Sequence, residues 1–99
     1  MTQTPAPRGD FPNLSRTVRG GVPLVYLDSG ATSQHPQRVL DAVRGMDIVH
    51  NGAVKRGSHQ LAEEATVAFE DARDRVAALV GVEPGEVVWT SGTTQSINL

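Results

Sequence analysis

The sequence has no cysteine, and its aromatic residues are limited to one tryptophan, one tyrosine and two phenylalanines among 99 residues. Without cysteine, this chain alone offers no disulfide bond, no zinc–thiolate site and no thiol nucleophile, which agrees with the cytoplasmic location that we expect. Nine basic residues against eleven acidic ones give a formal net charge of −2. Nucleic-acid-binding proteins usually carry a clustered basic face, so this charge balance disfavours nucleic acid as a partner.

Long apolar segments are also missing, because the apolar runs are short and are interrupted by charged residues or glycine. A membrane-spanning helix needs roughly 20 consecutive apolar residues, so we expect no association with a membrane. Residues 1–9 are polar, contain two prolines and lack the apolar core of a signal peptide. We interpret residues 1–9 as a disordered leader, and residues 10–21, where isolated apolar residues stand among polar ones, as an arm that lies on another surface.

Two short runs favour β-structure. Residues 24–27 (Leu-Val-Tyr-Leu) follow a Gly-Gly break and a proline, which predicts a first strand there. The small polar residues 28–34 predict a loop that leaves this strand. Residues 86–90 (Glu-Val-Val-Trp-Thr) follow a Pro-Gly turn and predict a second strand.

The spacing of apolar residues predicts helices. Pro36 suits a first helical position, and apolar residues then recur every three or four positions up to Met46, which predicts a helix with one buried face. The same spacing over Gln60–Val80 predicts a long amphipathic helix, with Gly81 as its left-handed cap. A further helix is expected to begin at Thr93. If the fold is complete, we expect one buried stripe on the long helix, comprising Leu61, Phe69, Val76 and Leu79.

The order strand, helix, helix, strand, helix predicts an α/β fold with helices crossing over between strands. A parallel sheet is covered on both faces and needs more strands than residues 22–99 supply. We therefore expect residues 22–99 to be the beginning of a larger domain whose remainder lies downstream. Chains of this length bury only about 60–70% of their unfolded surface, so we expect marginal stability from the chain alone.

The clearest chemical motif is Ser-Gly-Thr-Thr at residues 91–94, at a predicted strand-to-helix junction. Backbone amides in a first helical turn lack internal partners, and threonine hydroxyls add further donors, so a phosphate group fits there. The same residues also fit an ordinary helix start, in which Thr93 or Thr94 serves as a cap. From the motif alone, both interpretations stay open.

Four stretches occur in one order along the chain. They are Asp-Phe-Pro at 10–12 with Leu14, Leu-Asp-Ser-Gly-Ala-Thr-Ser at 27–33, Arg-Gly-Ser-His at 56–59 leading into Glu-Glu-Ala-Thr at 63–66, and Ser-Gly-Thr-Thr at 91–94 with Ile-Asn-Leu at 97–99. Together they resemble the opening of the Suf-type, group II cysteine desulfurases, which are close relatives of selenocysteine lyases within the aminotransferase class V family. The resemblance covers residues 10–99, and the ordered set is more specific than any single motif.

The resemblance implies an enzyme of fold type I that uses pyridoxal 5'-phosphate (PLP) and is usually a homodimer. Such an enzyme takes sulfur from L-cysteine, leaves L-alanine, and delivers the sulfur through an acceptor protein to iron–sulfur cluster assembly. The matching threonine pair of the family holds the cofactor phosphate, which implies this role for Thr93 and Thr94. The loops that match Gly30, Ala31 and Arg56 lie on the substrate side. By sequence, Gly30 and Ala31 also fit a plain turn, and Arg56 fits a plain surface arginine.

Lys55 is the only lysine, and it stands where members of that family commonly have histidine. The resemblance places the lysine that binds the cofactor, and the other catalytic groups including a cysteine, beyond residue 99. We therefore assign no catalytic residue here and expect the chain to be the N-terminal part of such an enzyme, inactive by itself. The three histidines share no metal-ligand spacing, so no metal site is predicted.

Two alternatives remain from the sequence. The chain could belong to another PLP enzyme of the same fold, such as an aminotransferase, a kynureninase-like hydrolase or an epimerase, because the phosphate motif is shared. It could also be a non-catalytic module that binds a phosphate ligand or a protein partner, which would agree with the absence of catalytic groups.

Overall fold

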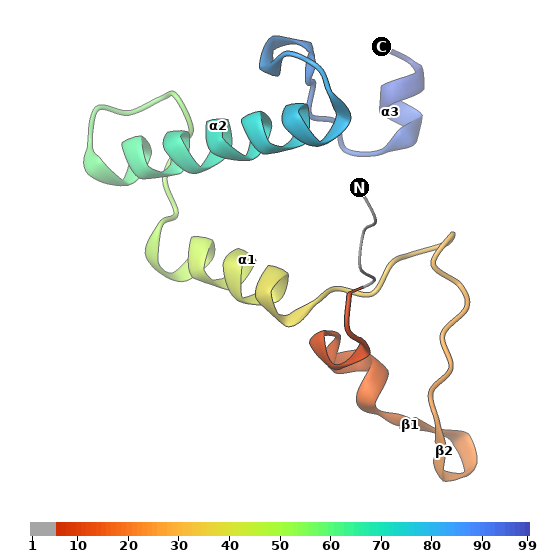
Figure 1. Ribbon diagram of the computed structural model, residues 1–99. Coiled ribbons are helices and arrows are strands. Elements are labelled where there is room, and N and C mark those ends of the chain that lie inside the picture. The colour runs from red at the N-terminus through yellow and green to blue at the C-terminus, as the bar shows by residue number, and fades with distance from the viewer. Residues whose placement is uncertain (1–5) are drawn as a thin grey trace. The chain divides into compact units, whose positions relative to one another are not determined.

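The structure is a computed structural model that describes residues 6–99 (Figure 1). The chain divides into two units, Met1–Val49 and His50–Leu99, each considered by itself. The first unit contains three short 3-10 helices, η1 (Arg8–Asp10), η2 (Pro12–Ser15) and η3 (Arg19–Gly21), two strands, β1 (Thr17–Val18) and β2 (Val22–Pro23), and the helix α1 (Gln37–Val49). The second unit contains the helices α2 (Gln60–Val80), η4 (Pro84–Glu86) and α3 (Thr93–Ile97).

A small hairpin forms the sheet of the first unit. β1 pairs with β2 in antiparallel fashion, and the register places Thr17 opposite Pro23. The chain reverses through Gly20 and Gly21, whose φ angles of 80° and 73° lie in the left-handed region. Glycine adopts these angles without the steric cost that a Cβ atom brings. The Gly-Gly pair at the end of the predicted arm therefore forms the turn of this hairpin.

Neither predicted strand forms. Leu24 donates a backbone hydrogen bond to the carbonyl of Arg16 at 3.2 Å, but residues 24–27 continue into no further pairing among the described residues. Val87 has extended dihedral angles (φ −93°, ψ 119°), yet residues 86–90 also lack a strand partner there. A strand needs a hydrogen-bonded neighbour, and a β-favouring run without one stays irregular. Helices with a two-stranded antiparallel sheet are consistent with an α/β protein.

The helix predicted from Pro36 onward is confirmed as α1. The carbonyl of Pro36 accepts hydrogen bonds from the amides of Val39 and Leu40 at 3.0 and 3.2 Å. None of the residues of α1 is buried, so the prediction of a buried face is wrong for this structure. Amphipathic spacing creates an apolar face, but the described residues of the first unit do not cover it.

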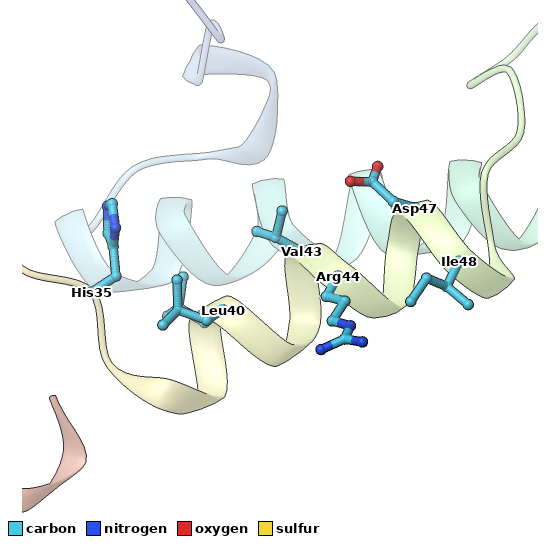
Figure 2. Close-up of a pocket in the computed structure, with 7 residues that line it drawn as sticks. His35, Leu40, Val43, Arg44, Asp47 and Ile48 are labelled. Atoms are coloured by element: carbon cyan, nitrogen blue, oxygen red, sulfur yellow. The ribbon is translucent and has the colours of Figure 1, made fainter. Parts of the chain in front are cut away.

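The uncovered face of α1 forms an open hollow of about 540 Å³. Figure 2 shows Leu40, Val43 and Asp47 along the same side of the helix. The hollow is therefore mainly apolar, with charged groups at its edges. Its lining residues are His35, Val39, Leu40, Val43, Arg44, Asp47 and Ile48.

The long helix α2 has the bounds that the sequence predicts. At its start, Nδ1 of His59 accepts a hydrogen bond from the amide of Ala62 at 3.3 Å, which satisfies one amide of the first turn. At its end, Gly81 adopts φ 77° and ψ 36°, and its amide donates to the carbonyl of Ala77 at 2.8 Å. The predicted left-handed cap is confirmed.

The buried side of α2 consists of alanines rather than of the predicted stripe. Leu61 and Leu79 are 43% and 75% exposed, and Phe69 and Val76 are half-buried. The stripe that we expect in the complete fold is not buried among the described residues, because the neighbouring chain segments approach α2 where its side chains are smallest. The buried residues of α2 are Ala62, Ala65 and Ala77.

After α2, the chain folds back along this helix (Figure 1). The predicted Pro-Gly turn lies in η4, which packs against α2. Further along, Trp89 meets Phe69 of α2 with ring centroids 6.2 Å apart. α3 then begins at Thr93, as predicted.

The predicted leader, residues 1–9, lies partly outside the described residues, which begin at residue 6. In its described part, the guanidinium of Arg8 donates to the carbonyls of Leu14 and Leu24 at 2.7 and 2.6 Å. These two bonds join the predicted arm to the segment after the hairpin.

Candidate functional site

The loop of residues 50–59, which carries Arg56, is held against α2 from its first residue onward. Nδ1 of His50 lies 2.9 Å from Oε2 of Glu64. The side-chain amide nitrogen of Gln60 donates to Oε1 of Glu64 at 2.7 Å. Both contacts stabilise the charged carboxylate, so His50 and then Gln60 lower the pKa of Glu64. Glu64 is thus a charged anchor for the start of the loop.

The middle of the loop approaches α2 closely. The amide of Lys55 donates to Oγ1 of Thr66 at 2.9 Å, and this hydroxyl in turn donates to the carbonyl of Ala62 at 2.7 Å. A Cβ atom built on Gly52 would lie 2.6 Å from the carbonyl oxygen of Leu61, closer than real Cβ contacts. Lys55 itself has a φ of 59°, a left-handed value that is uncommon outside glycine. Contacts with the helix therefore hold the loop in its conformation.

The side chain of Lys55 adds an ion pair with α2. Its Nζ lies 2.7 Å from Oε1 of Glu70, while Nε of Arg73 lies 3.5 Å from Oε2 of the same carboxylate. Oε1 has almost no solvent access, and the Lys55 ammonium meets it at the distance of an ion pair. The Lys55 ammonium lowers the pKa of Glu70, and the Arg73 guanidinium adds to this effect. Glu70 therefore bridges the loop and the helix.

Arg73 extends this cluster to the segment after α2. Its guanidinium donates to the carbonyl of Val87. It also lies 5.4 Å from the ring centroid of Phe69 and 6.0 Å from that of Trp89. The two rings meet edge to face at 69°. Such cation–π and aromatic contacts contribute roughly 0.5–1.5 kcal/mol each, so together they fix the segment that leads into α3 on α2.

Thr93 and Thr94 form the first turn of α3, and both are exposed. Gly92 precedes them in an extended conformation (φ 161°, ψ 178°). The amide and the hydroxyl of Ser91 both donate to Oε1 of Gln95, at 2.7 and 2.9 Å. Ser91 and Gln95 therefore brace the start of the helix, and the two threonine hydroxyls are left for other partners.

This first turn fits a phosphate group. Within residues 6–99, neither the hydroxyls nor the amides of Thr93 and Thr94 find a hydrogen-bond acceptor. A Cβ atom at Gly92 would meet nothing within 4 Å, so the space beside the backbone is open. Hydroxyl and amide donors suit the oxygens of a phosphate, and these residues could hold a cofactor through that group. The segment before this turn is extended but unpaired, so the predicted strand-to-helix junction is present only on its helical side.

Arg56 lies in the loop of residues 50–59 and is exposed. Its amide donates to the carbonyl of Ala53 at 3.5 Å, and its guanidinium has no ion pair within the described residues. The side chain is thus available to an anionic group. No contact among residues 6–99 joins Arg56 with Thr93 or Thr94.

Gly30 and Ala31 belong to the first unit, where they form an exposed turn. The amides of Ala31 and Thr32 donate to the carbonyl of Asp28 at 3.0 and 3.3 Å. The phenol oxygen of Tyr26 lies 2.5 Å from the carbonyl of Thr32 and so braces this turn. The tight turn that the small residues predict is present here.

The anchoring contacts were not predicted from the sequence. Glu70 and Arg73 are three positions apart on a helix, a spacing that places side chains on one side and could have indicated their contact. Lys55 reaches Glu70 across 15 positions, and no local signal indicates such a pair. Within residues 6–99, no helix is long and apolar enough to span a membrane, and no cluster of three or more histidine, aspartate or glutamate side chains could hold a metal ion.

Comparison with known proteins confirms the family that the motifs indicate. Residues 25–99 match the family model for aminotransferase class V. The chain is 55% identical over 92 residues to a probable cysteine desulfurase 2 of Mycobacterium leprae, which covers 93% of this chain and 22% of that protein. It is 50% identical over 95 residues to a probable cysteine desulfurase of Halobacterium salinarum, which covers 95% of this chain and 23% of the relative.

A cysteine desulfurase of Haloferax volcanii is 47% identical over 105 residues, which covers 93% of this chain and 25% of the relative. The chain therefore spans between a fifth and a quarter of the length of these three curated relatives. Because the family model matches most of the chain and named desulfurases match nearly all of it, the chain belongs to the aminotransferase class V family and is similar to its cysteine desulfurases.

Proposed function

We propose that this chain is the beginning of the PLP-binding domain of a cysteine desulfurase with the fold of type I PLP enzymes. The enzyme would convert L-cysteine to L-alanine and retain the sulfur as a persulfide on a cysteine outside this chain. The observation that carries the proposal is the identity of 47–55% to three proteins named cysteine desulfurase or probable cysteine desulfurase, over at least 93% of this chain.

We assign three roles to residues of this chain. Thr93 and Thr94 hold the phosphate of PLP through their hydroxyls and amides, which have no other acceptor among the described residues. Arg56 offers an exposed guanidinium to a carboxylate or phosphate on the substrate side. The small residues Gly30 and Ala31 leave room for the substrate beside their turn. When bound, PLP supplies the electron sink for chemistry at the α-carbon of the amino acid.

The wider setting follows from the same proposal. The complete enzyme would be a cytoplasmic homodimer of the Suf type that passes its sulfur to an acceptor protein for iron–sulfur cluster assembly. These features rest on the similarity in sequence to the named cysteine desulfurases.

The first experiment tests whether the 99-residue chain is active alone. The purified chain is mixed with PLP and reduced with borohydride, and mass spectrometry then locates any pyridoxyl adduct, alongside a sulfide-release assay with L-cysteine. We expect no turnover, and at most slight labelling of Lys55, because its ammonium is paired with Glu70. Labelling of the N-terminal amine reports ordinary amine reactivity and serves as the internal control. A stoichiometric adduct on Lys55 with enzyme-level turnover would contradict the assignment.

The second experiment separates a desulfurase from other class V enzymes. The full-length enzyme that carries this chain is incubated with L-cysteine, and alanine and persulfide sulfur are quantified. Equal amounts of both products support the proposal. Transamination of the amino acid, or hydrolysis of a kynurenine-type substrate, without sulfur release would assign the chain to one of the alternative enzymes instead.

A further inference from the structure

Two segments of the second unit carry proposed site residues, and both reach α2 through one carboxylate. Lys55, directly before Arg56, places its Nζ 2.7 Å from Oε1 of Glu70. Arg73 places its Nε 3.5 Å from Oε2 of Glu70. Arg73 also binds the carbonyl of Val87 and lies beside the ring of Trp89, in the segment that leads into the Thr-Thr turn. Glu70 thus stands between the two segments.

Glu70 is half-buried: 37% of its side chain is exposed, but one of its two carboxylate oxygens is shielded from solvent. Oε1 of Glu70 has almost no solvent access, and the side chain of Arg73 is only 21% exposed. The shielded oxygen meets a cationic partner in place of water, so removal of one partner disturbs the others. Glu70 therefore couples the positions of its two cationic partners.

Lys55 is also fixed through its backbone. Its backbone amide donates to Oγ1 of Thr66. Its φ angle of 59° lies in the left-handed region, which residues other than glycine rarely adopt, so contacts with α2 must maintain it. A residue held at both its amide and its ammonium leaves little freedom for Arg56, which follows it. The chemical identity of residue 55 thus affects where Arg56 stands.

We propose that Glu70 is a positioning residue, which holds the Arg56 loop through Lys55 and the segment before Thr93 through Arg73. Lys55 acts as the partner of Glu70 and not as an amine for the cofactor. The relevance of these two segments to catalysis rests on the proposed function, but the coupling between them is a property of this chain and is measurable without the cofactor.

The test uses the full 99-residue chain and compares Glu70→Gln with Asp71→Asn. Asp71 is exposed and makes no ion pair within the described residues, so its variant is the matched control for loss of one charge on α2. Two NMR measurements report the two segments. The hydrogen-exchange rate of the Lys55 amide reports the loop that carries Arg56, and the chemical shift of the single indole N–H of Trp89 reports the segment before Thr93. We expect Glu70→Gln to speed exchange of the Lys55 amide about tenfold and to displace the indole signal. Asp71→Asn should change neither signal.

Variants of Lys55 give a second readout. Lys55→Gln should displace the indole signal of Trp89, because the effect passes from residue 55 through the Glu70 carboxylate to Arg73. Lys55→Arg should restore the signal, because a cation again faces Glu70. The proposal is overturned if Glu70→Gln changes only one of the two measurements, or if Asp71→Asn changes both of them. It is also overturned if the Lys55 amide of the parent chain exchanges as fast as in an unfolded peptide. Failure of the proposed function would appear differently, as absence of PLP binding in a full-length enzyme whose two signals still move together.

Discussion

At the scale of single residues, Thr94 carries a hydroxyl with no acceptor among the described residues, in a turn that fits a phosphate group. We predict that Thr94→Val weakens retention of PLP in the full-length enzyme by about 1.5–3 kcal/mol, the contribution of one charge-assisted hydrogen bond. Equilibrium dialysis against PLP measures this change. Thr17→Val, in the exposed hairpin, is the control and should retain the parental affinity. Unchanged affinity in Thr94→Val would remove this residue from the phosphate site.

Gly52 and Gly45 form a matched pair of glycines. A methyl group on Gly52 would lie 2.6 Å from the carbonyl of Leu61, whereas one on Gly45 meets nothing within 4 Å. We predict that Gly52→Ala destabilises the chain, because the loop must move away from α2. Gly45→Ala should stabilise α1 by about 0.5–1 kcal/mol through its higher helix propensity. Urea denaturation followed by circular dichroism compares the two variants, and equal shifts of their midpoints would contradict the close approach at Gly52.

At the scale of elements, local signals account for what the sequence predicted well. The bounds of α2 were predicted because apolar spacing, a following glycine and the Pro-Gly turn all lie within the helix or directly beside it. The starts of α1 and α3 follow in the same way from Pro36 and from the Thr-Thr pair. A helix closes its hydrogen bonds within its own segment, so its prediction needs no distant partner.

The two strands failed for the opposite reason. Residues 24–27 and 86–90 have β-favouring composition, but their hydrogen bonds must be completed by another segment. The hairpin that does form, β1 with β2, was missed because its strands have two residues each and carry no alternating pattern. The turn of Gly20 and Gly21 was recognised as a break and not as a hairpin turn.

Phe69 tests the packing of α2 against the segment that follows it. The residue is half-buried and meets Trp89 edge to face, while Arg73 lies over its ring. We predict that Phe69→Ala costs about 2 kcal/mol of unfolding free energy, roughly half the cost for a fully buried phenylalanine. Leu79→Ala, at a position that is 75% exposed, should change stability by less than about 0.5 kcal/mol. Urea midpoints of both variants give the comparison, and a Phe69→Ala variant that unfolds with the parent would show that this contact does not form.

At the scale of the whole molecule, the described residues bury few large apolar side chains, so polar anchors matter for stability. The pKa values of Glu64 and Glu70 are lowered from their ordinary value of 4.5 in the folded chain. A carboxyl with a lowered folded pKa stabilises the fold fully above its ordinary pKa, and this contribution is lost as the pH falls through the lowered value. We therefore predict constant stability from about pH 7 to pH 5 and a decline below about pH 5.

The double variant Glu64→Gln/Glu70→Gln is the control for this pH dependence. It should be less stable than the parent near neutral pH, and the two urea midpoints should converge in acid, where the parental carboxylates are protonated. A parent and a double variant whose midpoints differ by the same amount at every pH would show that these two carboxylates do not stabilise the fold.

The candidate site was predictable only in the parts that motifs mark. The Thr-Thr turn and the small residues Gly30 and Ala31 lie where short motifs suggest, because each is built from adjacent residues. The role of Lys55 was not predictable, because it depends on Glu70, whose position relative to residue 55 is set by the path of the loop over α2. Contacts of this kind arise from packing and leave no periodic trace in the sequence.

The two histidines at the ends of the loop of residues 50–59 require opposite tautomers. Nδ1 of His59 accepts the amide proton of Ala62, so it must be bare, and a neutral ring then carries its proton on Nε2. Nδ1 of His50 faces a carboxylate oxygen of Glu64 at 2.9 Å, so it must carry a proton. The neutral rings at the two ends of one loop therefore hold their protons on different nitrogens, Nδ1 in His50 and Nε2 in His59. Nitrogen-15 chemical shifts of the two rings would register this opposition directly.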